Sequence, residues 1–404
     1  MARPLHILLA GGGTPGNLYP GLAVAAHIVE RLPEAVVTFI GSGRAHERQP
    51  VAAAGFGYAH LPSRAAPQNA LHALRFVTDN VAGYWACRWY FREKQVSLVV
   101  GLGGAASAPA VRAGISRGIP TVILEQNVVP SRVTRWLADA ATMVCAGFDQ
   151  TRDDLPSSAP VIVTGNPARP TFERLHRQRQ SWMAGYCALH DAHDAPIFAK
   201  PCAISPTKLQ QDHETLEKRL VIIGGAGGAR TINESIPQAL ARLRDQLAGW
   251  QIVHQSGEGQ LQETEQRYRA AGVEALVVAF IDEMAPVMFD SDLAVCRSGG
   301  TTLAELALAG LPAILVPYPR VIDFHLPNAE VFAAAGAATI IDETELLGPL
   351  ADEFVAHLKP LLTDAARRRR MSINMRRLAR PDAAARVTDA ICDALCGVRA
   401  RAAA

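Results

Sequence analysis

The chain has 404 residues, of which 49% are hydrophobic and 19% are charged, so we expect an ordinary folded protein with two domains and a core in each. Its 40 basic and 38 acidic side chains leave a net charge of +2, which gives no general argument for nucleic acid. The seven cysteines include no CxxC pair, and this favours reduced thiols in a cytosol. Because no signal-peptide pattern and no bilayer-length apolar run is present, we expect a soluble or peripheral protein.

The first half of the chain alternates short apolar runs with glycine-rich turns and helices. A strand is predicted at 5–10, and it enters the turn 11–17 before a helix that begins near Pro20. A nicotinamide site would need GxGxxG spacing and an acidic residue closing the second strand, whereas the strand 36–40 is followed by 41–43, Gly-Ser-Gly. A dehydrogenase is therefore not favoured. Further strands are predicted at 98–100, 121–124, 142–145 and 161–163.

A helix is predicted over 71–94, and it is unusually aromatic for a chain with 6% aromatic residues. Its apolar side chains include Leu74, Trp85 and Trp89, with arginines among them. One interpretation is that this face is core, as most apolar helix faces are. The other is an interfacial helix that places its aromatic side chains in the headgroup layer and its arginines on anionic lipid.

The stretch 292–318 reads as strand, glycine turn, helix and second strand. Residues 293–296 form a short apolar run suited to a buried parallel strand, and 298–302 supply a flexible turn with hydroxyl groups. Gly310 and Pro312 are expected to end the helix.

The start of this helix predicts a site for a nucleotide sugar. A helix that begins directly after such a turn presents unpaired N–H groups and the positive end of its dipole to an anion, and Arg297 adds a charge. Glu305, one turn into the helix, could accept both hydroxyls of a ribose. The alternative is that Ser298 and Thr301 merely cap the helix.

Strands alternate with helices in both halves, which implies parallel sheets wound on both faces with ligands at the carboxyl ends of the strands. In the second half, strands are predicted at 220–223, 251–254, 275–279, 293–296, 313–316 and 338–341. Between Thr171 and Lys218 the pattern lapses. We therefore expect a domain at 1–170, joined by a C-terminal helix at about 380–404, then a linker or insertion at 171–218, and a second domain at 219–379.

An ordered set of motifs extends over nearly the whole chain outside this linker. It comprises GGTPGNLYPGLAVA at 12–25, GLGGAASAP at 101–109, EQN at 125–127, TGNPAR at 164–169, GGAGGAR at 224–230, HQSGEG at 254–259, FIDEM at 280–284 and CRSGGTTLAE at 296–305. Single glycine loops are weak signals, but this ordered set resembles the MurG family of UDP-N-acetylglucosamine transferases. The resemblance implies an α/β GT-B fold, in which two Rossmann-like domains with doubly wound parallel sheets face a cleft.

The resemblance further implies transfer of N-acetylglucosamine with inversion at the anomeric carbon, without a metal or other cofactor. The donor would be UDP-N-acetylglucosamine, and the acceptor an undecaprenyl-diphosphate-linked muramyl pentapeptide of peptidoglycan synthesis. It implies peripheral contact with an anionic membrane at the cytoplasmic face of the inner membrane, and no nucleic acid.

Carried over by position, the resemblance assigns donor contacts to both halves. Phe280 would stack on uracil and the backbone of Ile281 would pair with its edge, while Glu305 would bind the ribose. Asn127 would face the transferred sugar and Arg169 the nucleotide. The remaining residues expected at the donor are Thr14, Pro15, Gly16, Ala226, Arg297, Ser298, Gly300, Thr301, Thr302 and Leu303.

The acceptor side departs from the family pattern. The loop 14–17 would approach the acceptor pyrophosphate, and Gly103, Gly104 and Ser107 would bind the acceptor. The family's loop ends in histidine, a candidate general base, but this chain has Asn17, whose amide cannot take a proton at neutral pH.

Other departures concern neighbouring loops. Leu124 replaces the histidine before EQN, and Ala105 replaces the tyrosine after the acceptor-loop glycines. The family's glutamine contacts to the donor sugar are absent after Pro319, where His325 is the nearest polar substitute. Asn17, Glu125 and His325 are therefore the candidate catalytic residues, with Glu125 before His325 as base. The alternatives are a glycosyltransferase with another acceptor, or a noncatalytic homologue that binds nucleotide or lipid precursor.

Overall fold

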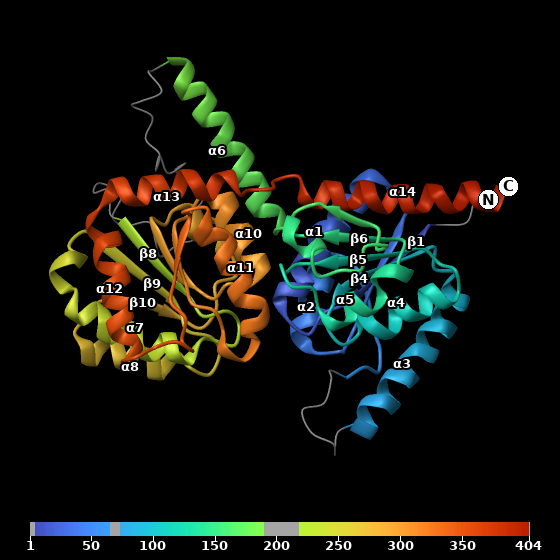
Figure 1. Cartoon of the computed structure of the whole chain (residues 1–404), viewed down its shortest axis with the longest axis horizontal. Coiled ribbons are helices and arrows are strands. Elements are labelled where there is room, and N and C mark those ends of the chain that lie inside the picture. Colours follow the sequence, from blue (N-terminus) through green and yellow to red (C-terminus); the bar gives the residue numbers. More distant parts are fainter. Residues whose placement is uncertain (1–4, 65–72, 190–217, 404) are drawn as a thin grey trace. The chain divides into compact units, whose positions relative to one another are not determined.

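The computed structural model describes residues 5–64, 73–189 and 218–403. The chain divides into two compact units. Unit 1 comprises Met1–Arg169 together with Arg380–Ala404, and unit 2 comprises Pro170–Ala379. Each unit is built on one parallel sheet that carries helices on both faces (Figure 1).

Within the described residues, unit 1 contains a seven-stranded sheet in the order β3-β2-β1-β4-β5-β6-β7, and every neighbouring pair is parallel. The strands are β1 (His6–Gly11), β2 (Val36–Gly41), β3 (Gly57–His60), β4 (Leu98–Gly103), β5 (Thr121–Glu125), β6 (Met143–Ala146) and β7 (Val161–Val163). The order reverses between β1 and β4. Doubly wound sheets bind ligands at the carboxyl side of such a reversal.

Successive side chains of a strand point to opposite sides of the sheet. Because neighbouring residues of these strands are apolar, both faces of the sheet are apolar. The helices are α1 (Pro15–Arg31), α2 (Ala45–Ala53), α3 (Ala73–Lys94), α4 (Ser107–Ser116), α5 (Arg132–Leu137) and α14 (Ala383–Ala403). Ile7 and Leu9 of β1 pack in a core with α1 and α14, whereas Leu8 and Ala10 pack in a second core with α3 and α4. The C-terminal helix thus belongs to the core of unit 1.

Unit 2 contains, among its described residues, a six-stranded parallel sheet in the order β10-β9-β8-β11-β12-β13. The strands are β8 (Lys218–Ile223), β9 (Trp250–Gln255), β10 (Leu276–Val278), β11 (Leu293–Cys296), β12 (Ala313–Leu315) and β13 (Ala338–Ile340). The helices are α6 (Pro170–Leu189), α7 (Arg230–Arg242), α8 (Leu261–Ala271), α9 (Met284–Phe289), α10 (Gly300–Ala309), α11 (Ile322–Ala334), α12 (Leu350–Thr363) and α13 (Ala365–Arg377). Here the order reverses between β8 and β11, so this sheet repeats the topology of the first.

The predicted helix is confirmed as α10, and it ends where expected, but it begins at Gly300, within the turn predicted at 298–302. Gly310 follows its last residue with φ of +63°, a left-handed conformation that favours glycine. By contrast, α2 and β3 were not predicted. Strand β3 is short and has no alternation of buried and exposed side chains, so its sequence carries no period-two signal.

The first part of the segment expected to be a linker or insertion at 171–218 is a helix, α6, over residues 170–189. Phe172, Leu175, His176 and Arg179 are buried at the spacing of one helical face. His176 Nδ1 contacts the carbonyl oxygen of Leu308 at 2.8 Å, and Arg179 Nη1 donates to the carbonyl oxygen of Ala309 at 2.8 Å. These bonds satisfy the last carbonyls of α10. The periodicity is hard to recognise in the sequence because three of the five buried residues described in this helix, Glu173, His176 and Arg179, are polar. Residues 190–217 lie outside the described part of the chain.

Candidate functional site

The turn between β8 and α7, which contains Ala226, is held by the loop after β9. The N–H of Gly224 donates to the carbonyl oxygen of Gln255 at 3.1 Å, and the N–H of Glu258 donates to that of Ala226 at 3.3 Å. Gln260 Nε2 also donates to the carbonyl oxygen of Gly227 at 3.0 Å. Ala226 therefore lies in a fixed turn at the carboxyl side of the strand-order reversal.

The buried side chain of His254 supports these loops through hydrogen bonds. His254 Nε2 lies 2.9 Å from Oδ1 of Asn233, and its Nδ1 lies 2.9 Å from the hydroxyl of Tyr268. Asn233 Nδ2 in turn donates to the carbonyl oxygen of Ser256 at 2.8 Å. Burial lowers the pKa of His254 to about 3, so the ring is neutral and its two nitrogens serve as one donor and one acceptor.

Phe280 and Ile281, the residues expected at the uracil, are half-exposed in the loop after β10. The N–H of Ile281 donates to Oε1 of Gln255 at 2.9 Å. Pairing with a uracil edge was expected to use the backbone of Ile281. In this conformation its N–H is already bonded, and its carbonyl group is the part left for a ligand.

The N-terminus of α10 has no side-chain cap. Gly299 occupies the N-cap position and has no side chain that could accept from the backbone N–H groups, and the first helical bond runs from the N–H of Leu303 to the carbonyl oxygen of Gly299 at 3.1 Å. Leu303 is 0% exposed, so the structure contradicts a donor contact for its side chain. The Ser298 hydroxyl is also buried, and it donates to the carbonyl oxygen of His325 at 2.7 Å rather than capping the helix.

The other predicted residues of this helix remain at its start. Gly300, Thr301 and Thr302 form the first turn of α10, and Glu305 follows one turn later. The Glu305 side chain is almost completely buried. The ribose contact of Glu305 stays a prediction.

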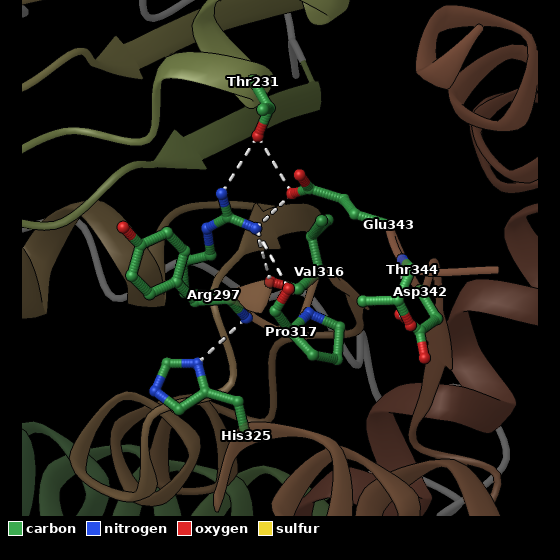
Figure 2. A network of polar contacts seen from close by, with 9 residues as sticks. Thr231, Arg297, Val316, Pro317, His325, Asp342, Glu343 and Thr344 are labelled. Carbon is green, nitrogen blue, oxygen red and sulfur yellow. Dashed lines mark hydrogen bonds and ion pairs between the residues drawn. The ribbon is translucent and has the colours of Figure 1, made fainter. Parts of the chain in front are cut away.

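Arg297 joins several segments of unit 2 at the carboxyl edge of the sheet (Figure 2). Its Nη1 donates to the carbonyl oxygens of Val316 at 3.1 Å and Pro317 at 3.2 Å, and the guanidinium forms an ion pair with Glu343. Its Nη2 donates to the hydroxyl of Thr231 at 3.0 Å, and this hydroxyl donates to Glu343 at 2.9 Å. We expected Arg297 to add a positive charge beside a bound phosphate. Instead, Glu343 neutralises that charge and the guanidinium holds the loops together.

His325 lies in the first turn of α11 beside the N-terminus of α10. The N–H of Tyr318 donates to its Nδ1 at 3.3 Å, and a Cβ built on Gly299 would lie 3.8 Å from its Nε2. Burial, with a smaller contribution from Arg297, lowers the pKa of His325 to about 4, so the ring is neutral at pH 7. Such a ring is a poor base, and its acceptor nitrogen is already bonded. The structure therefore contradicts the assignment of His325 as base.

Asn17 lies where the strand order of unit 1 reverses, between the turns after β1 and β4. Its Nδ2 donates to the carbonyl oxygen of Gly12 at 3.4 Å, and a Cβ built on Gly103 would lie 3.5 Å from its amide group. Gly104 has φ of +78°, and a Cβ there would lie 2.3 Å from the oxygen of Gly12, so glycine is required. The structure thus brings the predicted asparagine and the two predicted acceptor glycines together.

Glu47, in the first turn of α2, was not among the predicted site residues. Its carboxylate accepts bonds from the N–H of Gly13 at 2.7 Å, the N–H and hydroxyl of Ser42 at 2.8 and 2.7 Å, and the hydroxyl of Tyr58 at 2.6 Å. Burial acts to raise the pKa of Glu47, but these bonds outweigh it and the pKa lies below its usual value. The carboxylate fixes the turn after β1. Its sequence signal is weak, an acidic residue shortly after the glycines that follow β2.

Glu125, the other candidate base, ends β5 and is 3% exposed. One oxygen accepts from the N–H and the amide of Asn127, both at 3.2 Å. The other accepts from the N–H of Ser131 at 2.9 Å and the hydroxyl of Thr134 at 2.6 Å. Burial raises the pKa of Glu125, and these bonds oppose the rise. The carboxylate serves the start of α5 and is not accessible to an acceptor hydroxyl, so the structure contradicts its assignment as base.

Other predicted contacts of unit 1 have partners within that unit. The guanidinium carbon of Arg169 lies 4.9 Å from the centre of the Tyr19 ring on α1. Ser107 is buried beneath Gly101, where a built Cβ would lie 2.8 Å from its hydroxyl, so that hydroxyl is inaccessible to an acceptor. Thr14, Pro15 and Gly16 form the N-cap and first turn of α1 and are exposed or half-exposed.

Helix α3 carries an exposed apolar stripe. Leu74 is 73% exposed, Trp85 is 61% exposed and Trp89 is 67% exposed. Its opposite face contributes Cys87 and Phe91 to the core. The core interpretation is therefore wrong for the stripe. No helix in the described part of the chain is long and apolar enough to cross a membrane.

The chain has relatives along most of its length. It matches the N-terminal domain of glycosyltransferase family 28 over residues 7–146 and the C-terminal domain of that family over residues 219–387. A protein of Geobacter metallireducens is 33% identical over 387 residues, which are 95% of this chain and 97% of the relative. A protein of Nitratidesulfovibrio vulgaris is 34% identical over 403 residues, which are 98% and 99%. Both are named UDP-N-acetylglucosamine–N-acetylmuramyl-(pentapeptide) pyrophosphoryl-undecaprenol N-acetylglucosamine transferase, the MurG enzyme.

This chain belongs to the MurG family. The solved structure of MurG from Acinetobacter baumannii superimposes with a TM-score of 0.68 at 24% identity, over 96% of this chain and 100% of that one. UDP-N-acetylglucosamine 2-epimerase from Neisseria meningitidis gives a TM-score of 0.62 at 14% identity, over 96% and 100%. At these identities the likeness shows the fold alone. The chain is a glycosyltransferase of the GT-B fold, and the predicted family and fold class are confirmed.

Proposed function

We propose that this member of the MurG family transfers N-acetylglucosamine from UDP-N-acetylglucosamine to the undecaprenyl-diphosphate-linked muramyl pentapeptide, with inversion and without a metal or other cofactor. The observation that carries the proposal is the N-terminus of α10, which begins with glycines at the strand-order reversal of unit 2. Such a terminus suits a diphosphate. The names of the full-length relatives supply the sugar and the acceptor.

Unit 2 binds the donor in this proposal. The first turn of α10 and the turn containing Ala226 surround the diphosphate, and Glu305 accepts from the ribose hydroxyls. Phe280 stacks on uracil, and the carbonyl group of Ile281 pairs with its edge. Support comes from the hydrogen bonds that hold these loops at one edge of the sheet.

Unit 1 binds the acceptor pyrophosphate around Asn17, Gly103 and Gly104. Asn17 Oδ1 can accept a hydrogen bond from the attacking hydroxyl and orient it, but an amide does not remove its proton. Since Glu125 and His325 are both unsuitable, no base is assigned. A noncatalytic homologue that binds the same ligands is for this reason the second candidate function.

Membrane contact belongs to the exposed stripe of α3. Its indole rings suit the headgroup layer, and Arg75 and Arg92, which are exposed on the same helix, suit anionic phosphate. In this proposal the contact is made at the cytoplasmic face of the inner membrane, where the protein would meet its lipid-linked acceptor. The protein is peripheral in this proposal.

Transfer of labelled N-acetylglucosamine to a lipid-linked muramyl pentapeptide tests the proposal. The expected result is a radiolabelled lipid product that depends on the acceptor and on UDP-N-acetylglucosamine. Calorimetry with UDP on the same preparation separates the candidates. UDP binding without transfer to this acceptor supports the noncatalytic function, whereas failure to bind UDP contradicts both.

A further inference from the structure

The ring of His325 has one nitrogen directed to the backbone and one directed to the N-terminus of α10. Tyr318 donates its N–H to Nδ1, and Nε2 is 3.8 Å from the place where a Cβ on Gly299 would be. Because Nδ1 accepts this bond, the neutral ring carries its proton on Nε2. For the residues that the structure describes, no hydrogen bond of Nε2 is present. An N–H donor is thus directed at the start of the helix.

The backbone of His325 is fixed relative to the helix N-terminus. The Ser298 hydroxyl donates to the carbonyl oxygen of His325 at 2.7 Å, and Asn328 Nδ2 donates to the carbonyl oxygen of Ser298 at 3.2 Å. Ser298 and Asn328 are both completely buried. The residue before the N-cap of α10 is therefore bonded twice to α11, and the imidazole cannot drift far from the backbone donors of α10.

Burial, and to a smaller extent the charge of Arg297, lowers the pKa of His325 and keeps the ring neutral. The guanidinium of Arg297 opposes a second positive charge nearby, while Glu343 cancels its attraction for anions at a distance. What remains is a helix N-terminus with a neutral N–H beside it. Hydrogen bonds to a charged acceptor are stronger than those to a neutral one, so this set of donors favours a phosphate oxygen over a sugar hydroxyl.

We propose that His325 is a donor-binding residue whose Nε2–H donates to a phosphate oxygen of the nucleotide sugar at the N-terminus of α10. This rests on the proposed function only in taking the ligand to be a UDP-sugar. It replaces the role of a base with that of a fixed hydrogen-bond donor. No proton is transferred by His325 in the reaction.

Two substitutions separate the two nitrogens of the ring. In His325→Gln the terminal amide extends to about the position of Nε2 and keeps a distal N–H donor. In His325→Asn the shorter side chain can still accept the N–H of Tyr318, but it no longer reaches the phosphate. The two variants retain a polar side chain at this place, and their thermal unfolding midpoints show whether both are folded.

Calorimetry with UDP, with UDP-N-acetylglucosamine and with uridine measures the contact. We expect His325→Asn to weaken UDP binding about tenfold or more, His325→Gln to stay within about threefold of the unmodified protein, and uridine binding to be unchanged in both. The 15N shifts of the unmodified protein labelled at histidine should show the proton on Nε2 before any ligand is added.

Several outcomes overturn the inference. These are a proton on Nδ1, equal UDP affinity in His325→Asn and the unmodified protein, equal weakening in both variants, or a loss seen with UDP-N-acetylglucosamine but not with UDP, which would place the contact on the sugar. Each of these leaves the proposed function intact as long as the unmodified protein binds the UDP-sugar. If the unmodified protein does not bind it, the proposed function and this inference both fail.

Discussion

Arg297 and Glu343 form an ion pair across 46 positions of sequence, and their side chains are only 14% and 8% exposed. The pair connects the residue that follows β11 with the loop that follows β13. Since neither charge has ready access to water, each depends on the other for compensation.

Arg297→Ala should therefore destabilise unit 2 by about 3 kcal/mol or more, because it leaves the Glu343 carboxylate largely buried with only the Thr231 hydroxyl. Urea unfolding measures the change. The exposed pair Arg242–Asp352 is the matched control, and Asp352→Ala should cost no more than about 1 kcal/mol. Equal losses in the free energy of unfolding for the two substitutions would show that burial does not determine how much the Arg297–Glu343 pair contributes to stability.

Glu305→Ala should weaken UDP binding about tenfold or more, since it removes a charge-assisted contact with the ribose. Glu330, an exposed residue of α11, provides the control, and Glu330→Ala should leave binding unchanged. Calorimetry with UDP gives both values. Unaltered affinity in Glu305→Ala would remove Glu305 from the donor site.

Asn17→His should raise turnover, because a histidine between the turns after β1 and β4 supplies the base that the chain lacks there. General-base catalysis commonly contributes about 10²- to 10⁴-fold. The rate should also acquire a pH dependence with an apparent pKa near that of histidine. Lower turnover with no new pH dependence would show that this loop does not hold the base.

Glu125→Gln is the companion to this experiment. An amide cannot accept all the hydrogen bonds that Glu125 accepts, so the substitution should lower the stability of unit 1. The shape of the pH–rate profile should stay as it is. If that profile changes while stability does not, Glu125 takes part in proton transfer after all.

Replacing Trp85 and Trp89 by Ser should reduce pelleting with liposomes that contain anionic lipid. Both indoles are exposed, so their removal should not disturb the core, and binding should fall through lost burial in the headgroup layer. Trp182→Ser, an exposed tryptophan on α6, controls for general effects of losing an indole. Equal pelleting of all variants would exclude the α3 stripe as the membrane contact.

Acid should destabilise unit 2 before most carboxylates titrate. His254 has a pKa of about 3 in the folded protein and about 6.5 in the unfolded chain. At a pH between these two values, the unfolded chain binds a proton at His254 and the folded protein does not. Stability should fall as pH decreases from 6.5, by about 2 kcal/mol at pH 5 from His254 alone. Urea unfolding at pH 7 and pH 5 measures this, and His254→Gln should show a weaker dependence. Equal midpoints at the two pH values would contradict the buried neutral state.

The elements around the donor site could be predicted because their signals are local. The apolar run at 293–296, the glycines after it and Gly310 lie within 18 residues, and each follows from its own conformational preference. The role of Glu125 could not be predicted in this way. Its place at a strand end suggested a base, but Ser131 and Thr134 bond to it only once α5 has folded.

The same limit explains why Glu47 was missed. Its partners come from the turns after β1 and β2 and from β3, and no spacing in the sequence joins them. In α6, His176 and Arg179 are polar although they are buried, so the buried face of this helix shows no regular apolar pattern in the sequence. In both cases a polar group became internal because distant backbone groups needed a partner.

The position of α14 in unit 1 has a consequence for biosynthesis. Val387 and Ile391 of α14 fill a core whose buried side chains outside that helix come from the first 145 residues of the chain. During translation, one apolar face of that core stays uncovered until unit 2 has been synthesised and α14 follows it. Pro170–Ala379, by contrast, emerges from the ribosome as one uninterrupted segment and can complete its own core first. The part of the protein that starts the sequence is therefore the part that finishes folding.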